Sequence, residues 1–90
     1  MYTQDKITKG GEITAAGTFV IGDRQPFYLF IVATTDAASA SAVMTGRIVY
    51  NKEDTPVPLV AGMWNPVVLS SAEITEDMLS NYRIFYGQEG

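Results

Sequence analysis

The run Phe27–Val32 constrains the fold of this chain more than any other segment. It reads FYLFIV, and an uninterrupted apolar run of this length between polar stretches is typical of a β-strand. Side chains alternate along a strand, so the odd-numbered residues of the run point to one face and the even-numbered residues to the other. Because both faces are apolar, both need cover. Two interpretations follow: a central strand buried within the core, or a strand whose second face meets another subunit.

The composition limits both size and chemistry. Ninety residues correspond to about one domain, and 47% hydrophobic residues are enough to build a thin core. Without cysteine or histidine, the chain has no thiolate nucleophile, no imidazole base and no Cys or His metal ligand. Two acid pairs, Glu53-Asp54 and Glu76-Asp77, fit solvated charges in a turn and at a helix N-terminus better than a catalytic pair. We therefore expect no enzymatic activity, no cofactor and no metal.

The charge balance and the length of the apolar runs argue against nucleic acids and membranes as partners. Ten acidic and six basic residues give a net charge of −4, which repels a phosphate backbone, so we expect no nucleic acid partner. The first residues, MYTQDKITKG, do not form a signal peptide, and no apolar run reaches the 18 or so residues of a membrane span. We expect a protein made in the cytoplasm that does not enter a membrane.

Short runs rich in Thr, Val, Ile, Tyr and Phe, separated by Gly, Pro, Asn and Asp, predict a mostly β chain. Besides the run already described, strands are predicted at residues 18–21, 43–51, 57–60, 67–70 and 82–87, and residues 7–8 and 13–15 are predicted to flank the turn of an N-terminal ribbon. The glycine pair within Lys9–Glu12 predicts a tight hairpin, and the small residues of Ala33–Ala42 predict a loop. Pro58 lacks an amide donor, which confines it to a sheet edge or to the start of a strand.

A short helix is predicted between Glu73 and Ser80. Ser70 and Glu73 have the spacing of a capping box, and Thr75 before two acids fits an N-cap. Together these elements predict an all-β protein: a small antiparallel β-sandwich or barrel of six to seven strands, with one helical turn near residues 73–80. We expect a single domain over residues 1–90, in which residues 1–16 form an N-terminal ribbon or arm.

Three segments between Pro26 and Gly87 resemble a known family. They are the strand PFYLFIVATTD, the segment VPLVAGMWNPVVLSS with its glycine turn and proline, and the ending YRIFYG. Their order is similar to that of small spike-base and head-decoration proteins of tailed bacteriophages and gene transfer agents. The resemblance implies a non-enzymatic structural component of the virion. Such a protein docks on the major capsid protein or other virion proteins as a decoration, spike-base or fibre-base subunit, alone or as a homo-oligomer.

The residues point to an interface on the even-numbered face of the apolar run. We expect contacts with other subunits at Tyr28, Phe30 and Val32, joined by Met63 and Trp64 from a turn predicted at Ala61–Pro66. Two alternatives stay open. The chain is either a tail or baseplate component, or a stand-alone module that binds carbohydrate or protein. For the second alternative Trp64 would stack on a sugar ring, whereas a lone tryptophan in a turn is more often a plug over the core.

Overall fold

A computed structural model describes residues 7–34, 40–49 and 51–89. Within these residues it contains seven strands and one short helix. The elements are β1 (Ile7–Ile13), β2 (Gly17–Phe19), β3 (Tyr28–Ala33), β4 (Ser41–Ile48), β5 (Thr55–Val60), β6 (Leu69–Ile74), α1 (Glu76–Asn81) and β7 (Tyr82–Glu89).

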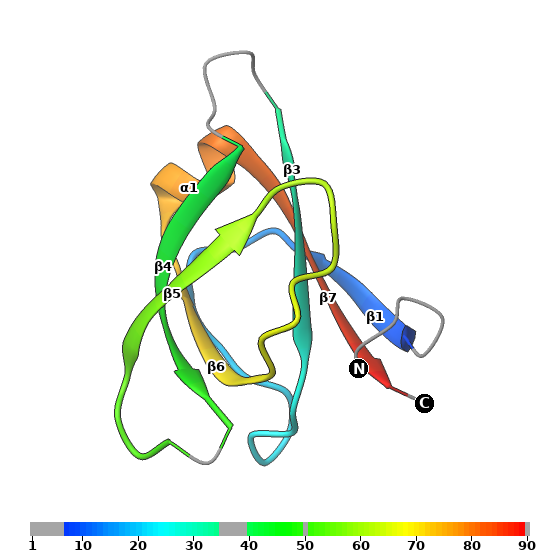
Figure 1. The fold of residues 1–90 in the computed structure, drawn as a ribbon, viewed down its shortest axis with the longest axis vertical. Helices are drawn as coiled ribbons and strands as arrows, with labels where there is room; N and C mark the ends of the chain where they lie inside the picture. The colour runs from blue at the N-terminus through cyan, green and yellow to red at the C-terminus, as the bar shows by residue number, and fades with distance from the viewer. Residues whose placement is uncertain (1–6, 35–39, 50, 90) are drawn as a thin grey trace.

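The strands form two antiparallel sheets that pack into a β-sandwich. One sheet has the order β1-β7-β3 and the other the order β2-β6-β4-β5. The connection from β5 to β6 runs alongside β3 (Figure 1), and its backbone bonds to that strand. Gly62 and Asn65 donate their N–H groups to the carbonyl oxygens of Ile31 and Leu29, and Phe27 exchanges two bonds with Leu69. These bonds tie the two sheets together along β3.

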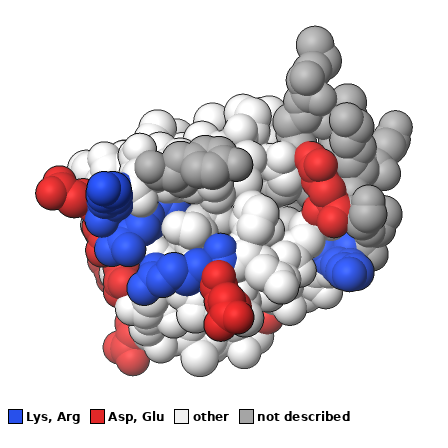
Figure 2. Space-filling view, turned by 90° about the horizontal axis from the view of Figure 1, so that it is seen from below, with Lys and Arg blue, Asp and Glu red and all other residues white. Residues whose placement is uncertain are grey.

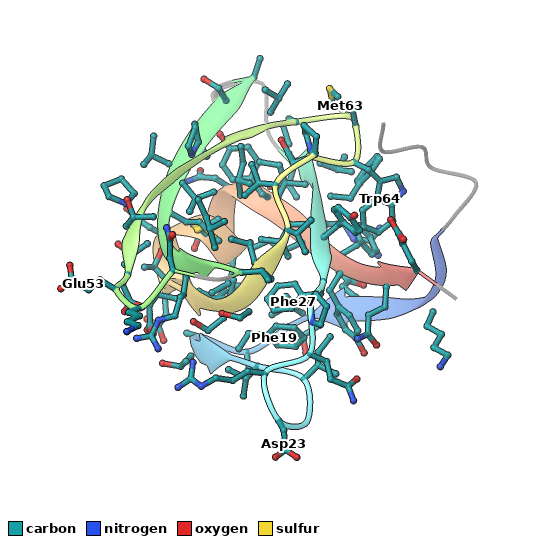
Figure 3. The ribbon with its side chains drawn as sticks, turned by 60° about the horizontal axis from the view of Figure 1, so that its bottom comes forward. Phe19, Asp23, Phe27, Glu53, Met63 and Trp64 are labelled. Carbon is teal, nitrogen blue, oxygen red and sulfur yellow. The ribbon has the colours of Figure 1, made fainter. Side chains whose placement is uncertain are left out.

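The core lies between the two sheets, where side chains from their inner faces pack together. Its fully buried members are Phe27, Leu29, Ile31, Val57, Leu59, Leu69, Ala72 and Ile84. Phe19 and Phe27 meet inside one end of the sandwich (Figure 3), where their ring centroids are 5.2 Å apart in an edge-to-face arrangement. The prediction of an all-β sandwich with one short helix is confirmed.

The predicted hairpin at Lys9–Glu12 is wrong. Strand β1 continues through Gly10 and Gly11 and pairs with β7, with one register shift between Ile7 and Lys9. The glycines serve close packing instead of a turn. Gly10 lies opposite Gly87, and a Cβ on Gly10 would overlap the carbonyl oxygen of Tyr86. The rest of the predicted N-terminal arm, residues 1–6, lies outside the described residues.

The helix begins later than the capping-box pattern predicts. Ser70 and Glu73 belong to β6, and α1 starts at Glu76. Thr75 is the N-cap as expected, because its hydroxyl accepts a hydrogen bond from the backbone N–H of Met78 at 3.2 Å. The acids Glu76 and Asp77 occupy the first turn, where the helix dipole favours negative charge.

Other strand predictions hold with shifted boundaries. In β4, Met44 is buried while Val43 and Thr45 are exposed. Pro58 lies on β5, an edge strand, as predicted. Within the predicted strand 43–51, Tyr50 lies outside the described residues, as does the 35–39 portion of the predicted loop Ala33–Ala42.

Candidate interaction surface

Strand β3 combines a fully buried face with a second face that the same chain partly covers. Its inward side chains, Leu29 and Ile31, have no exposed surface. On the outer face Tyr28 is 9% exposed, Phe30 is half-buried and Val32 is 38% exposed. The outcome falls between the two interpretations of the sequence: β3 is an edge strand of its sheet, and its second face is sheltered at one end and open at the other.

The cover over the outer face of β3 comes from the turn between β5 and β6. Asn65, which is only 3% exposed, holds this turn in place. Its side-chain oxygen accepts the Val60 N–H at 2.7 Å, and its amide nitrogen donates to the carbonyl oxygens of Leu29 and Val60, both at 3.2 Å. Because Asn65 is bound to both β3 and β5, the preceding residue, Trp64, is held beside Phe30.

Three aromatic rings meet on this outer face. The rings of Phe30 and Trp64 pack edge to face with centroids 5.4 Å apart, and Phe85 on β7 packs against Phe30 at 6.4 Å. All three side chains are half-buried. Together with Val32 they form what we term the aromatic patch: Phe30, Val32, Trp64 and Phe85. It lies on the side of the β1-β7-β3 sheet that faces away from the core.

An ion pair borders the aromatic patch. Arg83 lies 5.3 Å from the centroid of the Phe85 ring and donates two hydrogen bonds to the Glu12 carboxylate, at 3.0 and 3.1 Å. These hydrogen bonds, helped by the positive charge of Arg83, lower the pKa of Glu12, while the same contact raises the pKa of Arg83. The cation is therefore held at the rim of the patch beside an aromatic ring.

The structure brings together only some of the residues predicted for the interface. Phe30, Val32 and Trp64 belong to the aromatic patch. Tyr28 is mostly buried, and its hydroxyl donates to Glu89 at 2.9 Å. Met63 is 49% exposed and points away from the body at the tip of the turn, whereas Trp64 lies next to β3 (Figure 3).

One member of the patch, Phe85, is absent from the sequence-based prediction. The signal was present in the alternation of the closing strand. Tyr82, Ile84 and Tyr86 share the inner face, which assigns Arg83 and Phe85 to the outer one. What could not be read from the sequence was that β7 lies next to β3, with Phe85 directly opposite Phe30.

Two shallow grooves adjoin each other at the start of β3. One is polar, about 340 Å³, and is lined by Lys9, Gln25, Pro26, Tyr28, Val68, Gln88 and Glu89. The other is apolar, about 600 Å³, and is lined by Pro26, Ile48, Val49, Pro66, Val67 and Val68. In the polar groove the amide of Gln88 donates to Gln25 and to the carbonyl oxygen of Pro26.

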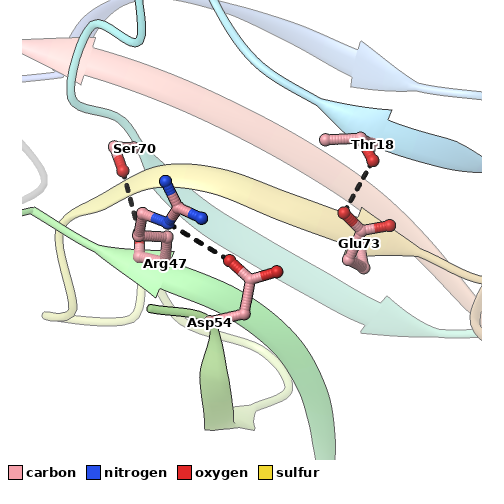
Figure 4. Close-up of polar contacts among 5 residues, drawn as sticks. All are labelled: Thr18, Arg47, Asp54, Ser70 and Glu73. Atoms are coloured by element: carbon pink, nitrogen blue, oxygen red, sulfur yellow. Dashed lines mark hydrogen bonds and ion pairs between the residues drawn. The ribbon is translucent and has the colours of Figure 1, made fainter. Parts of the chain in front are cut away.

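The outer face of the other sheet is polar near its centre. The Thr18 hydroxyl donates to Glu73 at 2.6 Å, and Arg47 donates to Asp54 at 3.2 Å (Figure 4). At the end of the molecule that is lowest in Figure 1, positive and negative side chains lie side by side at both margins (Figure 2). That end of the molecule therefore carries charges of both signs.

The described residues form neither a metal-binding cluster nor a membrane-spanning helix. Within residues 7–34, 40–49 and 51–89, no three acidic side chains gather closely enough to hold a metal ion. Nor does that part of the chain include a helix with the length and apolar character needed to cross a membrane.

No protein-family model, curated protein or solved structure matches the chain.

Proposed function

We propose that this protein is a non-enzymatic docking subunit that attaches to a larger protein assembly through the aromatic patch. The observation that carries the proposal is the cluster of Phe30, Trp64 and Phe85 on the outside of a sandwich whose core is already filled from the inner faces. Aromatic side chains and arginine dominate the energetics of protein interfaces. Here Arg83 lies at the rim of the patch.

The setting that we propose is a bacteriophage virion, in which the protein serves as a capsid decoration, spike-base or fibre-base subunit. This part of the proposal follows from the resemblance of residues 26–87 to such proteins. A small rigid sandwich with half-exposed aromatic rings fits the role, because rigid aromatic anchors bind with little loss of conformational entropy. A tail or baseplate position uses the same surface.

The test is to rebuild particles from which the gene has been deleted. Purified protein is added back, and the 9.8 kDa chain that stays with the particles is measured by mass spectrometry. Val32→Asp introduces a carboxylate into the aromatic patch at a residue that is 38% exposed. Val43→Asp is the matched control on the other sheet, where the same side chain is 67% exposed.

We expect the Val43→Asp variant to bind like the wild type and the Val32→Asp variant to lose most of its attachment. Val32 lies opposite Arg83, so the new carboxylate faces a positive charge and leaves the fold intact. Circular dichroism checks that both variants are folded. Equal attachment of the two variants would show that the aromatic patch is not the docking surface. Wild-type protein that never associates with particles would refute the virion setting.

A carbohydrate-binding module is the second candidate, and the polar groove favours it. Amide, carboxylate, ammonium and tyrosine groups around an opening of about 340 Å³ suit a sugar ring. NMR titration with a glycan library separates the two candidates. Shifts centred on Gln25 and Gln88 support the groove, whereas a sugar stacked on the aromatic patch shifts the indole signal of Trp64.

A further inference from the structure

The sandwich has four sheet edges among its described strands, and three of them are blocked. On β5, Pro56 and Pro58 lie opposite Thr45 and Val43 on β4. A proline has no N–H, so both prolines sit where the backbone groups point outward, and the outer edge lacks two donors. The next outward group, the Val60 N–H, is taken by Asn65.

The edges of β2 and β3 are protected in other ways. Strand β2 has only three residues, too few to template a partner strand. Along β3 and the residue before it, the outward carbonyl oxygens of Phe27, Leu29 and Ile31 accept hydrogen bonds from the N–H groups of Leu69, Asn65 and Gly62. This leaves β1.

The backbone hydrogen bonds of β3 also show which backbone groups of β1 point away from β7, because β7 lies between the two strands. In antiparallel pairs, hydrogen-bonded and non-bonded positions alternate. The backbone N–H and C=O groups of Phe27, Leu29 and Ile31 point away from β7. The backbone groups of the even-numbered residues of β3 therefore bond to Arg83, Phe85 and Gly87 on β7.

The even-numbered residues of β7 therefore bond to β1. Tyr86 lies opposite Gly11, and Ile84 lies opposite Ile13. The N–H and C=O groups of Gly10 and Glu12 consequently point outward, along an edge that no other described strand covers.

We propose that this edge of β1 pairs antiparallel with the same edge of a second copy of the chain. Any two copies present the same pattern of free donors and acceptors. With the other three edges blocked, β1 is the strand that a second copy offers in return. The result is a closed two-fold dimer with a continuous six-stranded sheet.

The side chains of β1 select one register. A two-fold axis through Gly10 pairs this glycine with its counterpart and places Lys9 opposite Gly11 of the second copy. Because glycine has no side chain, the two residues at the axis cannot clash. An axis through Gly11 would instead place Lys9 opposite Ile13, which is buried in the core. The Gly10 register is therefore the favoured one.

The two Lys9 side chains then occupy diagonal positions on one face. Their repulsion weakens the dimer at low ionic strength, so added salt strengthens it. The contact is also small, which makes the association weak and concentration-dependent. This pairing uses a sheet edge and does not depend on the proposed docking function of the aromatic patch.

Two variants of one residue test the pairing. Glu12→Ala removes the ion pair with Arg83 but keeps the outward N–H, whereas Glu12→Pro removes both. Sedimentation velocity up to about millimolar protein gives the dissociation constants. We expect the wild type and the alanine variant to dimerise with constants within about threefold, and the proline variant to stay monomeric. A proline is tolerated at an edge position whose N–H faces solvent.

Amide hydrogen exchange on the wild-type protein gives an independent result if the proline variant does not fold. In dilute solution the amides of Gly10 and Glu12 exchange fast, while those of Gly11 and Ile13 are protected by β7. In concentrated solution Gly10 and Glu12 become protected as well. A wild type that stays monomeric at all concentrations, a proline variant that still dimerises, or unchanged exchange at Gly10 and Glu12 would each overturn the proposal.

Discussion

The buried side chain of Asn65 offers the sharpest test of how this fold holds its surface. It accepts one hydrogen bond from Val60 and donates to the carbonyl oxygens of Leu29 and Val60. Asn65→Ala removes these three contacts. At about 1 kcal/mol each, with a further cost for the Val60 N–H that loses its acceptor, we expect a loss of roughly 2–4 kcal/mol in the free energy of unfolding.

Asn65→Asp keeps the shape of the side chain and changes only its chemistry. The oxygen that accepts from Val60 remains, but a second oxygen now faces the carbonyl oxygens of Leu29, Val60 and Met63. Burial and these carbonyl groups raise the pKa of the new carboxyl in the folded state. Below that pKa the protonated carboxyl donates again, so the folded protein binds more protons than the unfolded chain. The deficit of this variant should therefore shrink as the pH falls.

Urea denaturation measures both variants, and the melting temperature follows them. For a domain of this size 1 kcal/mol corresponds to about 4–8 °C, so Asn65→Ala should melt at least about 8 °C lower. Trp64 is the only tryptophan of the chain, and its fluorescence should report a loosened turn. Two results would refute the reasoning: a loss below about 0.5 kcal/mol for the alanine variant, or an aspartate variant whose deficit does not change with pH.

Three further predictions concern other parts of the sandwich. Gly10→Ala should cost about 1–3 kcal/mol in urea denaturation, because the new methyl group meets the Tyr86 carbonyl oxygen; an unchanged midpoint would contradict this packing. Glu12→Gln should be less stable than the wild type at neutral pH. Because Arg83 lowers the pKa of Glu12, this difference should fade as the pH falls from the ordinary value of 4.5 through the lowered one, and a constant difference would exclude the ion pair as its cause. Thr75→Ala should lower the free energy of unfolding by about 1 kcal/mol, whereas Thr75→Ser keeps the hydroxyl and should lose much less, as measured by thermal melting. Equal melting temperatures of the two variants would show that the Thr75 hydroxyl does not stabilise the helix as its N-cap.

The features that could be predicted are those set by a residue itself or by its alternation with its neighbours in the sequence. The faces of the run Phe27–Val32 follow from period-two geometry, and so does the inner face of β7. Pro58 identifies its strand as an edge because a missing N–H is a property of the residue itself. Thr75 likewise carries its capping hydroxyl wherever the helix starts. Each of these inferences needs no knowledge of which strands are neighbours.

The features that were missed depend on distant partners. A glycine pair without Cβ atoms suits a tight turn, but in Gly10 the same property allows close contact with Gly87, 77 residues away. Ser70 and Glu73 have the spacing of a helix cap. They became part of β6 because Ala72 and Ile74, between and after them, fill the core.

Asn65 was missed for a related reason. An asparagine before a proline marks a turn, and the turn was predicted. Its burial could not be, since the carbonyl oxygen that it binds belongs to Leu29, 36 residues earlier in the chain. A buried asparagine is recognisable only once its partners are placed, and the same holds for Phe85 beside Phe30.

The two proposals combine into a statement about binding strength. An antiparallel pair of β1 strands is related by a two-fold axis perpendicular to the sheet, so the outer faces of both copies point to the same side. The dimer would then present two aromatic patches to one surface. On an assembly with repeated sites, two weak contacts bind far more tightly than one, because the second contact forms intramolecularly. Compared with Glu12→Ala, which also lacks the ion pair with Arg83, Glu12→Pro should therefore weaken attachment to a dense array of sites and have the same affinity for one isolated site, whereas Val32→Asp should weaken both. Surface plasmon resonance at high and low partner density distinguishes these outcomes. An equal loss at both densities for the proline variant would show that β1 acts through the fold of the patch and not through pairing.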